Sequence, residues 1–192
     1  MQKAITEKTK AAAFGAVLAA ATLWAGCAAN RDTNWRSKLA AELPVLGHRN
    51  WIIVADSAYP AQSRPGIETI ATGSDQIQVV KAVLKAVDDA AHVRANVYLD
   101  AEMQFVSPQD APGIEHYRSQ LSALLAGRAP ESLPHEDLIA KLDDAAKMFR
   151  VLILKTDLTM PYTSVFLELD CGYWNPDAER KMREAIRQAV RP

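Results

Sequence analysis

The spacing of apolar residues changes along the chain, and it separates candidate strands from candidate helices. The run "WIIVA" at 51–55 is continuously apolar and lies between Asn50 and Asp56. A short run of this kind, rich in β-branched and aromatic residues, is typical of a strand buried on both faces of a sheet. Similar reasoning predicts strands in "RANVYLDAEM" at 94–103, "FRVLILK" at 149–155 and "SVFLEL" at 164–169.

Between these runs, apolar residues recur every three or four positions, which is the spacing of one helix face. Helix starts are indicated by Ser74 and Asp75, by Pro112, by Pro134, and by Asn175 with Pro176, because these residue types cap or begin helices. The four predicted faces are Ile77, Val80, Leu84 and Val87; Ile114, Tyr117, Leu121 and Leu124; Leu138, Leu142 and Ala145; and Met182, Ile186 and Val190.

Strands that alternate with helices imply crossover connections and a mainly parallel sheet. The sequence therefore predicts an α/β fold, a three-layer sandwich whose sheet is mainly parallel. With 192 residues, one folded domain is expected.

The first 27 residues have a different pattern. Lys3, Lys8 and Lys10 precede an uncharged stretch at 11–26, which is shorter than the ~20 apolar residues that span a bilayer. Because small residues follow it, the segment is predicted to be a secretory signal peptide. A weakly membrane-associated helix is the alternative.

The end of this leader, "LWAGC", resembles the lipobox of bacterial lipoproteins. Ala25 and Gly26 fit that pattern before Cys27, whereas Trp24 stands where an aliphatic residue is usual. We expect lipidation of Cys27, a tether over 28–38, a domain over 39–173 and a C-terminal helix extension over 174–192. Ordinary cleavage near "AGCAA" is the alternative. The expected location is the bacterial cell envelope, as a periplasm-facing lipoprotein that meets the membrane only through its lipid.

The composition of the chain argues against several classes of partner and cofactor. The net charge of −1 shows no basic excess, which argues against nucleic acid as a partner. Four histidines and two cysteines occur at no zinc-site spacing, and the glycines form no nucleotide-binding signature. We therefore expect neither a metal nor a cofactor.

The stretch "LGHRNWIIVADSAYP" resembles the start of the D-ribose pyranase / L-fucose mutarotase (RbsD/FucU) family. That family has a Gly-His pair, an apolar strand, an aspartate and a nearby proline, matched here by Gly47, His48, Asp56 and Pro60. Its later Tyr-x-Asn segment is matched by "PYTSVFLELDCG", with Tyr162 in place and Ser164 where the asparagine would be; "PHEDL" offers His135 upstream. The resemblance covers about residues 39–173.

The resemblance implies an enzyme that interconverts anomers or ring forms of an unphosphorylated monosaccharide without metal or cofactor. It also implies a ring-like homo-oligomer of more than two subunits, with sites at subunit contacts. Carried over by motif, His48 is the expected catalytic residue. The expected sugar-binding residues are Asp56, His135, Tyr162 and Ser164.

The chemistry suits these residue types. Opening a hemiacetal requires protonation of the ring oxygen and removal of the anomeric hydroxyl proton, and histidine, with an ordinary pKa of ~6.5, can do either. An ionised carboxylate can accept hydrogen bonds from sugar hydroxyls.

His48 and Asp56 are predicted at opposite ends of a strand, because a strand rises ~3.3 Å per residue. One site can contain both only if the loop at 47–50 folds back or if two subunits each contribute one residue. The alternatives are local roles for both, such as a turn capped by Asp56, in a non-catalytic sugar-binding protein of the same fold. A hydrolase that uses His48 and Asp56 is a third and weaker alternative, since the chain shows no nucleophile motif.

The leader generates the first prediction. Expressed in a bacterium, the full chain should be processed and should partition into detergent, and Cys27→Ser should abolish that partitioning. Detergent-phase extraction followed by mass spectrometry of the N-terminus measures both. A soluble, processed product from both versions would contradict lipidation while leaving export intact.

Overall fold

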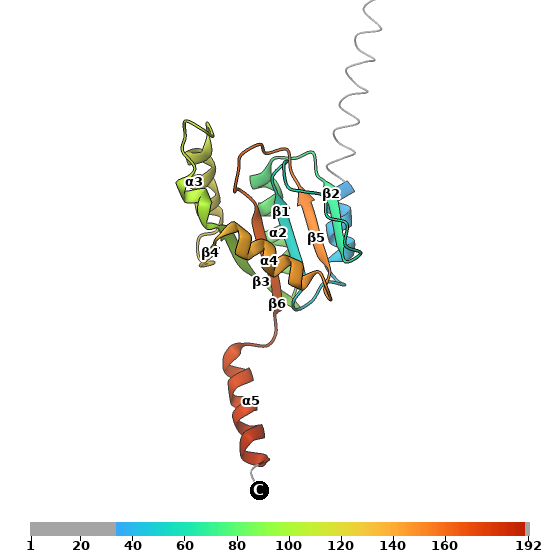
Figure 1. Ribbon diagram of the computed structural model, residues 1–192. Helices are drawn as coiled ribbons and strands as arrows, with labels where there is room; N and C mark the ends of the chain where they lie inside the picture. The colour runs from blue at the N-terminus through green and yellow to red at the C-terminus, as the bar shows by residue number, and fades with distance from the viewer. Residues whose placement is uncertain (1–33, 191–192) are drawn as a thin grey trace, which may run out of the picture.

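A six-stranded sheet lies at the centre of the computed structural model, which describes residues 34–190 (Figure 1). Its strands lie in the spatial order β2-β5-β1-β6-β3-β4. Their bounds are β1 Trp51–Ala55, β2 Ile67–Ala71, β3 Val93–Asp100, β4 Glu131–Leu133, β5 Val151–Lys155 and β6 Val165–Cys171.

Five strands run in one direction and β6 runs against them. β5 is parallel to both β1 and β2, and β3 is parallel to β4, whereas β6 is antiparallel to β1 and to β3. The predicted mainly parallel sheet is confirmed. Since β6 is reversed, its first residues lie at the edge where β1 and β3 end, and its last residues lie where those strands begin.

Helices cover both faces of the sheet, so the predicted three-layer α/β sandwich is confirmed. A helix at 34–42, α2 and α3 pack on one face, and α4 packs on the other. The helix bounds are α2 Gln76–Asp89, the 3-10 helix η1 Ala101–Phe105, α3 Ile114–Leu124, α4 His135–Ala145 and α5 Pro176–Ala189.

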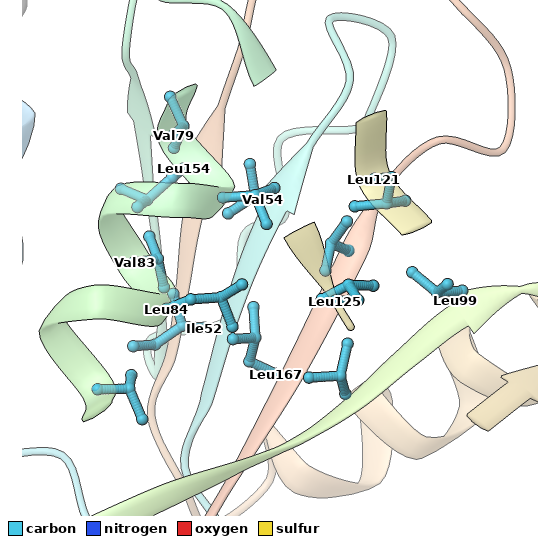
Figure 2. Packing of buried hydrophobic residues seen from close by; sticks show 14 of the residues in the cluster. Ile52, Val54, Val79, Val83, Leu84, Leu99, Leu121, Leu125, Leu154 and Leu167 are labelled. Atoms are coloured by element: carbon cyan, nitrogen blue, oxygen red, sulfur yellow. The ribbon is translucent and has the colours of Figure 1, made fainter. Parts of the chain in front are cut away.

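Strand β1 contributes to both hydrophobic layers. Ile52 and Val54 point to the layer beneath α2, where Figure 2 shows them beside Val83 and Leu84. Trp51 and Ile53 belong to the opposite layer, under α4. The continuous apolar run therefore reflects burial on both faces, as predicted.

A buried polar group sits at the start of α2. The Asp75 side chain caps this helix by accepting from the Gln78 N–H at 3.0 Å. The next residue, Gln76, has no exposed surface; its amide nitrogen donates to the Tyr117 hydroxyl at 2.9 Å and to the Thr163 carbonyl oxygen. The residue types Ser74 and Asp75 predicted the start of this helix, but no sequence pattern predicted the buried amide.

Three features of the fold differ from the predictions. The polar segment predicted as a tether over 28–38 is helical from residue 34, with Trp35 fully buried. The edge strands β2 and β4 were not predicted, because their residues are mostly exposed or half-buried and show no apolar pattern. The predicted strand at 94–103 ends at Asp100, where η1 begins.

The C-terminal helix α5 is present as predicted, with Asn175 accepting from the Ala178 N–H at 2.9 Å. It extends away from the sheet (Figure 1), and none of its residues is buried. Met182, Ile186 and Val190, predicted as its apolar face, are exposed.

The described residues, 34–190, include no helix with the length and apolar character needed to cross a membrane. The predicted signal peptide and Cys27 lie outside the described residues.

Candidate functional site

Four of the five residues predicted to form a sugar site gather at the edge where the parallel strands end. Asp56 follows β1, His135 follows β4, and Tyr162 and Ser164 precede the reversed strand β6. Asp100, the last residue of β3, joins them. We call Asp56, Asp100, His135, Tyr162 and Ser164 the carboxyl-edge cluster. Ligands of parallel sheets commonly bind just beyond the carboxyl ends of the strands.

Asp56 is held by two hydrogen bonds. The Ser164 hydroxyl donates to Oδ2 at 3.0 Å, and the Ala58 N–H donates to Oδ1 at 2.9 Å. The second bond is the turn-capping role considered from the sequence. A carboxylate has about four acceptor positions, so Asp56 retains capacity for ligand hydroxyls.

Asp100 and His135 are hydrogen-bonded to each other within the cluster. His135 Nδ1 lies 2.9 Å from Asp100 Oδ1, and the Asp100 side chain is only 1% exposed. Its second oxygen, Oδ2, is buried with no hydrogen-bond partner among the described residues. Burial raises the pKa of Asp100; the contact with His135 opposes that rise, while Glu102 and Asp56 add to it.

The backbone around His135 and Tyr162 is fixed locally. Glu102 accepts from the His135 backbone N–H at 3.0 and 3.1 Å, and this bond lowers the pKa of Glu102. Tyr162 adopts a positive φ of 56°, which is uncommon outside glycine. Its ring meets the His135 imidazole edge to face at 5.6 Å.

Tyr59 is a buried residue near these acidic groups. It is 4% exposed, and its pKa is raised first by burial and then by the charges of Asp100, Asp143 and Asp56. The cluster therefore combines carboxylates, a hydroxyl, an imidazole and aromatic rings. Such groups can accept hydrogen bonds from a polyhydroxyl ligand and move a proton.

His48 lies apart from this cluster, at the opposite edge of the sheet. Its Nδ1 donates to Asp170 Oδ1 at 2.9 Å. Asp170 lies six residues along β6 from Ser164, the partner of Asp56, so the two contacts are about 20 Å apart at ~3.4 Å per residue. The loop at 47–50 does not fold back, and within one subunit His48 is not part of the Asp56 site.

His48 instead lines a cavity of about 500 Å³, which we call the His48 pocket. It lies between the end of β6 and the start of α5. Its lining residues are His48, Arg94, Asp170, Cys171, Trp174, Asn175, Pro176 and Glu179.

Asp170 is fixed in this pocket by three partners. Arg94 lies opposite it in the β3–β6 register and pairs with Oδ2, while the Cys171 N–H donates to Oδ1 at 2.8 Å. Burial acts to raise the pKa of Asp170, but Arg94, the Cys171 N–H and His48 outweigh it, so the pKa lies below its usual range.

Sequence reasoning did not assign roles to Asp100 or Asp170. Asp100 could have been found by the signal that identified Asp56, a carboxylate that directly follows buried apolar residues of a strand. Asp170 had no such signal, because its partners are 122 and 76 residues away in the chain.

Within residues 34–190, no group of three or more His, Cys, Asp and Glu side chains is placed to hold a metal ion. The two carboxylates of the cluster, Asp56 and Asp100, contact a serine hydroxyl, a backbone N–H group and an imidazole.

Comparison with known proteins places these motifs in a family. The sequence model of the RbsD / FucU transport protein family matches residues 30–171 of this chain. A comparison with curated protein sequences found no match.

Solved structures include similar folds. The Bacillus subtilis RbsD structure, complexed with D-ribose, has 21% sequence identity to this chain and a TM-score of 0.50. The match covers 70% of this chain and 92% of the RbsD chain. FucU from Bifidobacterium longum shares 19% identity and a TM-score of 0.47, with coverages of 70% and 94%. The fucose mutarotase from Streptococcus pneumoniae, in complex with L-fucose, has 19% sequence identity to this chain and a TM-score of 0.43. The match covers 65% of this chain and 85% of the mutarotase chain.

The buried Asp100 generates a prediction about pH. Because its pKa is raised in the folded protein, the stability it contributes is fully present below the unfolded pKa and is lost as pH rises through the folded pKa. Asp100→Asn removes this dependence. The free energy of unfolding of the variant minus that of the wild type should therefore increase from pH 4 to pH 7.

Urea unfolding at each pH measures this difference. Asp110→Asn, at a surface carboxylate that pairs with Ser107, is the matched control. A difference that stays constant with pH would contradict the raised pKa of Asp100.

Proposed function

The chain belongs to the RbsD / FucU transport protein family, and we propose that it interconverts anomers or ring forms of an unphosphorylated monosaccharide. The observation that carries the proposal is the meeting of Asp56, His135, Tyr162 and Ser164 at one sheet edge from three separate parts of the sequence. The relatives whose structures contain D-ribose and L-fucose support the ligand class.

The proposed reaction needs one acid and one base. The acid protonates the ring oxygen, the base takes the proton of the anomeric hydroxyl, and the C1–O5 bond breaks to give the open-chain carbonyl. Closure on the other face of the carbonyl reverses the transfers and yields the other anomer. Histidine is suited to either transfer near neutral pH.

We propose His48 as one of these groups. Its Nδ1 is engaged by Asp170, which fixes the imidazole and leaves Nε2 to exchange a proton with the sugar. The side chain is 62% exposed, so a ligand or a second subunit can reach it. Asp56, His135, Tyr162 and Ser164 are proposed to bind the sugar.

The distance between these groups leads to a proposal about assembly. Since His48 and Asp56 lie at opposite edges of one sheet, a shared site requires His48 from one subunit and the carboxyl-edge cluster from another. A ring-like homo-oligomer of more than two subunits would bring every His48 to a neighbouring cluster.

A non-catalytic sugar-binding protein of the same fold is the second candidate. It is favoured by Ser164, which stands where the family has an asparagine and whose hydroxyl is already bonded to Asp56. As an exported lipoprotein, the protein would in either case meet sugars in the cell envelope before uptake.

His48→Ala should slow anomer exchange by about 10²–10⁴-fold, the usual contribution of a general acid or base. Sugar affinity should change much less, because proton transfer matters in the transition state. Exchange NMR with D-ribose, L-fucose, D-galactose and D-glucose measures the rate, and saturation-difference NMR measures binding. Circular dichroism establishes that each variant is folded.

Asp56→Asn is the matched variant at the other edge. It keeps the side-chain shape but weakens hydrogen bonds to hydroxyls that are worth ~1.5–3 kcal/mol each when charged, so affinity should fall. Wild-type exchange by folded His48→Ala would show that the assignment of His48 is wrong. Binding without exchange by the wild-type protein would favour the non-catalytic candidate.

Mixed oligomers test the shared site. Neither His48→Ala nor Asp56→Asn subunits should be fully active alone, but their co-expression should restore native sites wherever the two kinds meet. At equal amounts, about one quarter of the contacts would carry both native residues if subunits mix at random. Exchange rates of purified, doubly tagged oligomers check this. Activity no greater than the average of the two variants would exclude a site shared between subunits.

A further inference from the structure

The His48 pocket contains an aromatic residue that the proposed mechanism does not use. Trp174 follows β6, lines the pocket and is 42% exposed. We propose that its indole is the stacking surface for the monosaccharide ring that His48 acts on. This inference rests on the proposed function and adds a binding residue to the same site.

The indole is held in place beside the pocket. Its Nε1 donates to Glu179 Oε2 at 2.7 Å, and Arg183 pairs with the other oxygen of the same carboxylate. A fixed ring loses little conformational freedom when a ligand covers it. The other two described tryptophans, Trp35 and Trp51, are 0% and 3% exposed and belong to the core.

The pocket contains both an apolar surface and polar groups, which suit the two kinds of surface on a sugar ring. A pyranose has C–H groups on its ring faces and hydroxyls around its rim. The indole offers an apolar face to the ring, while the carboxylates of Asp170 and Glu179 and the guanidinium of Arg94 lie in the same pocket for the rim. The volume of about 500 Å³ lies in the ~300–1,000 Å³ range of small-molecule sites.

The charge of the pocket favours a neutral sugar. Its lining residues carry two carboxylates and one guanidinium, and that guanidinium is paired with Asp170. A phosphorylated sugar would bring further negative charge toward Glu179, and the one arginine of the lining is already paired with Asp170. This arrangement agrees with the unphosphorylated substrate class.

His48 and Trp174 act on the same ligand because they line one cavity. With Nδ1 bound to Asp170, Nε2 is the ring nitrogen left for a sugar oxygen, and a sugar in the His48 pocket would contact both His48 and Trp174. Trp174 lies beyond residue 171, where the family match ends. The stacking surface would therefore be a feature of this chain's C-terminal extension.

Intrinsic fluorescence tests the inference directly. The full chain carrying Trp24→Phe retains Trp35, Trp51 and Trp174, of which Trp174 alone is accessible in the described structure. Iodide should quench its emission, and D-ribose, L-fucose, D-galactose or D-glucose, whichever binds, should reduce that quenching. Trp174→Phe in the same background should remove the iodide-sensitive component.

Affinity provides the second measurement. Trp174→Ala should weaken sugar binding by about tenfold, the scale of one lost aromatic contact, while anomer exchange at saturating sugar changes less than threefold. Trp174→Phe should retain most of the affinity. Tyr173→Ala is the matched control, because Tyr173 is the neighbouring aromatic residue, is 79% exposed and is absent from the pocket lining.

The outcomes separate this inference from the proposed function. Sugar binding and exchange that are unchanged in Trp174→Ala, with iodide quenching unaffected by sugar, would overturn the role of Trp174 alone. Weakened binding in Trp174→Ala, in a wild-type protein without exchange activity, would support the stacking surface and reject the enzyme. A wild type that neither binds nor exchanges these sugars would overturn both.

Discussion

The buried amide of Gln76 is the interaction on which the carboxyl-edge cluster depends. Its nitrogen bonds to Tyr117 and to the Thr163 carbonyl, and Tyr117 donates to the same carbonyl at 2.7 Å. Its oxygen lies 2.8 Å from the Thr156 hydroxyl, which is also 2.9 Å from the Ala55 carbonyl. These contacts fix the residues next to Asp56, Tyr162 and Ser164. A buried polar atom that loses its partner costs about 1–3 kcal/mol, so the network has little freedom to rearrange.

The reversed strand β6 connects the carboxyl-edge cluster to the His48 pocket. It starts beside Asp56 and ends beside His48, so each end contributes a side chain to a different edge: Ser164 to one and Asp170 to the other. A parallel strand in this position would have placed its first residues away from the carboxyl ends of β1 and β3. The reversal brings Tyr162 and Ser164 to the cluster, while the length of β1 separates His48 from Asp56.

Much of this fold follows from local sequence. The run at 51–55 predicted β1 because both faces of that strand are buried, and Asp75 and Asn175 predicted helix starts because capping is a local interaction. The edge strands β2 and β4 could not be predicted, since exposed edge positions need no apolar pattern. Among the candidate site residues, His48 and Asp56 were predicted by motif, whereas Asp170 acquires its partners only through strand pairing. The arrival of Tyr162 and Ser164 at the Asp56 edge depends on the direction of β6, which the sequence pattern does not specify.

Each of the two sheet edges carries a histidine paired with an aspartate, and the surroundings of the two pairs differ. His135 with Asp100 and His48 with Asp170 are each joined through Nδ1 at 2.9 Å. Asp100 is 1% exposed and has a raised pKa, whereas Asp170 is 23% exposed and has a lowered pKa under the influence of Arg94. Environments that shift two carboxyl groups in opposite directions are a common way to assign acid and base roles. In the proposed shared site, the two imidazoles would approach one sugar from two subunits. The firmly ionised Asp170 beside Arg94 and the buried Asp100 would then hold these two imidazoles in electrostatically different surroundings on the two sides of the sugar.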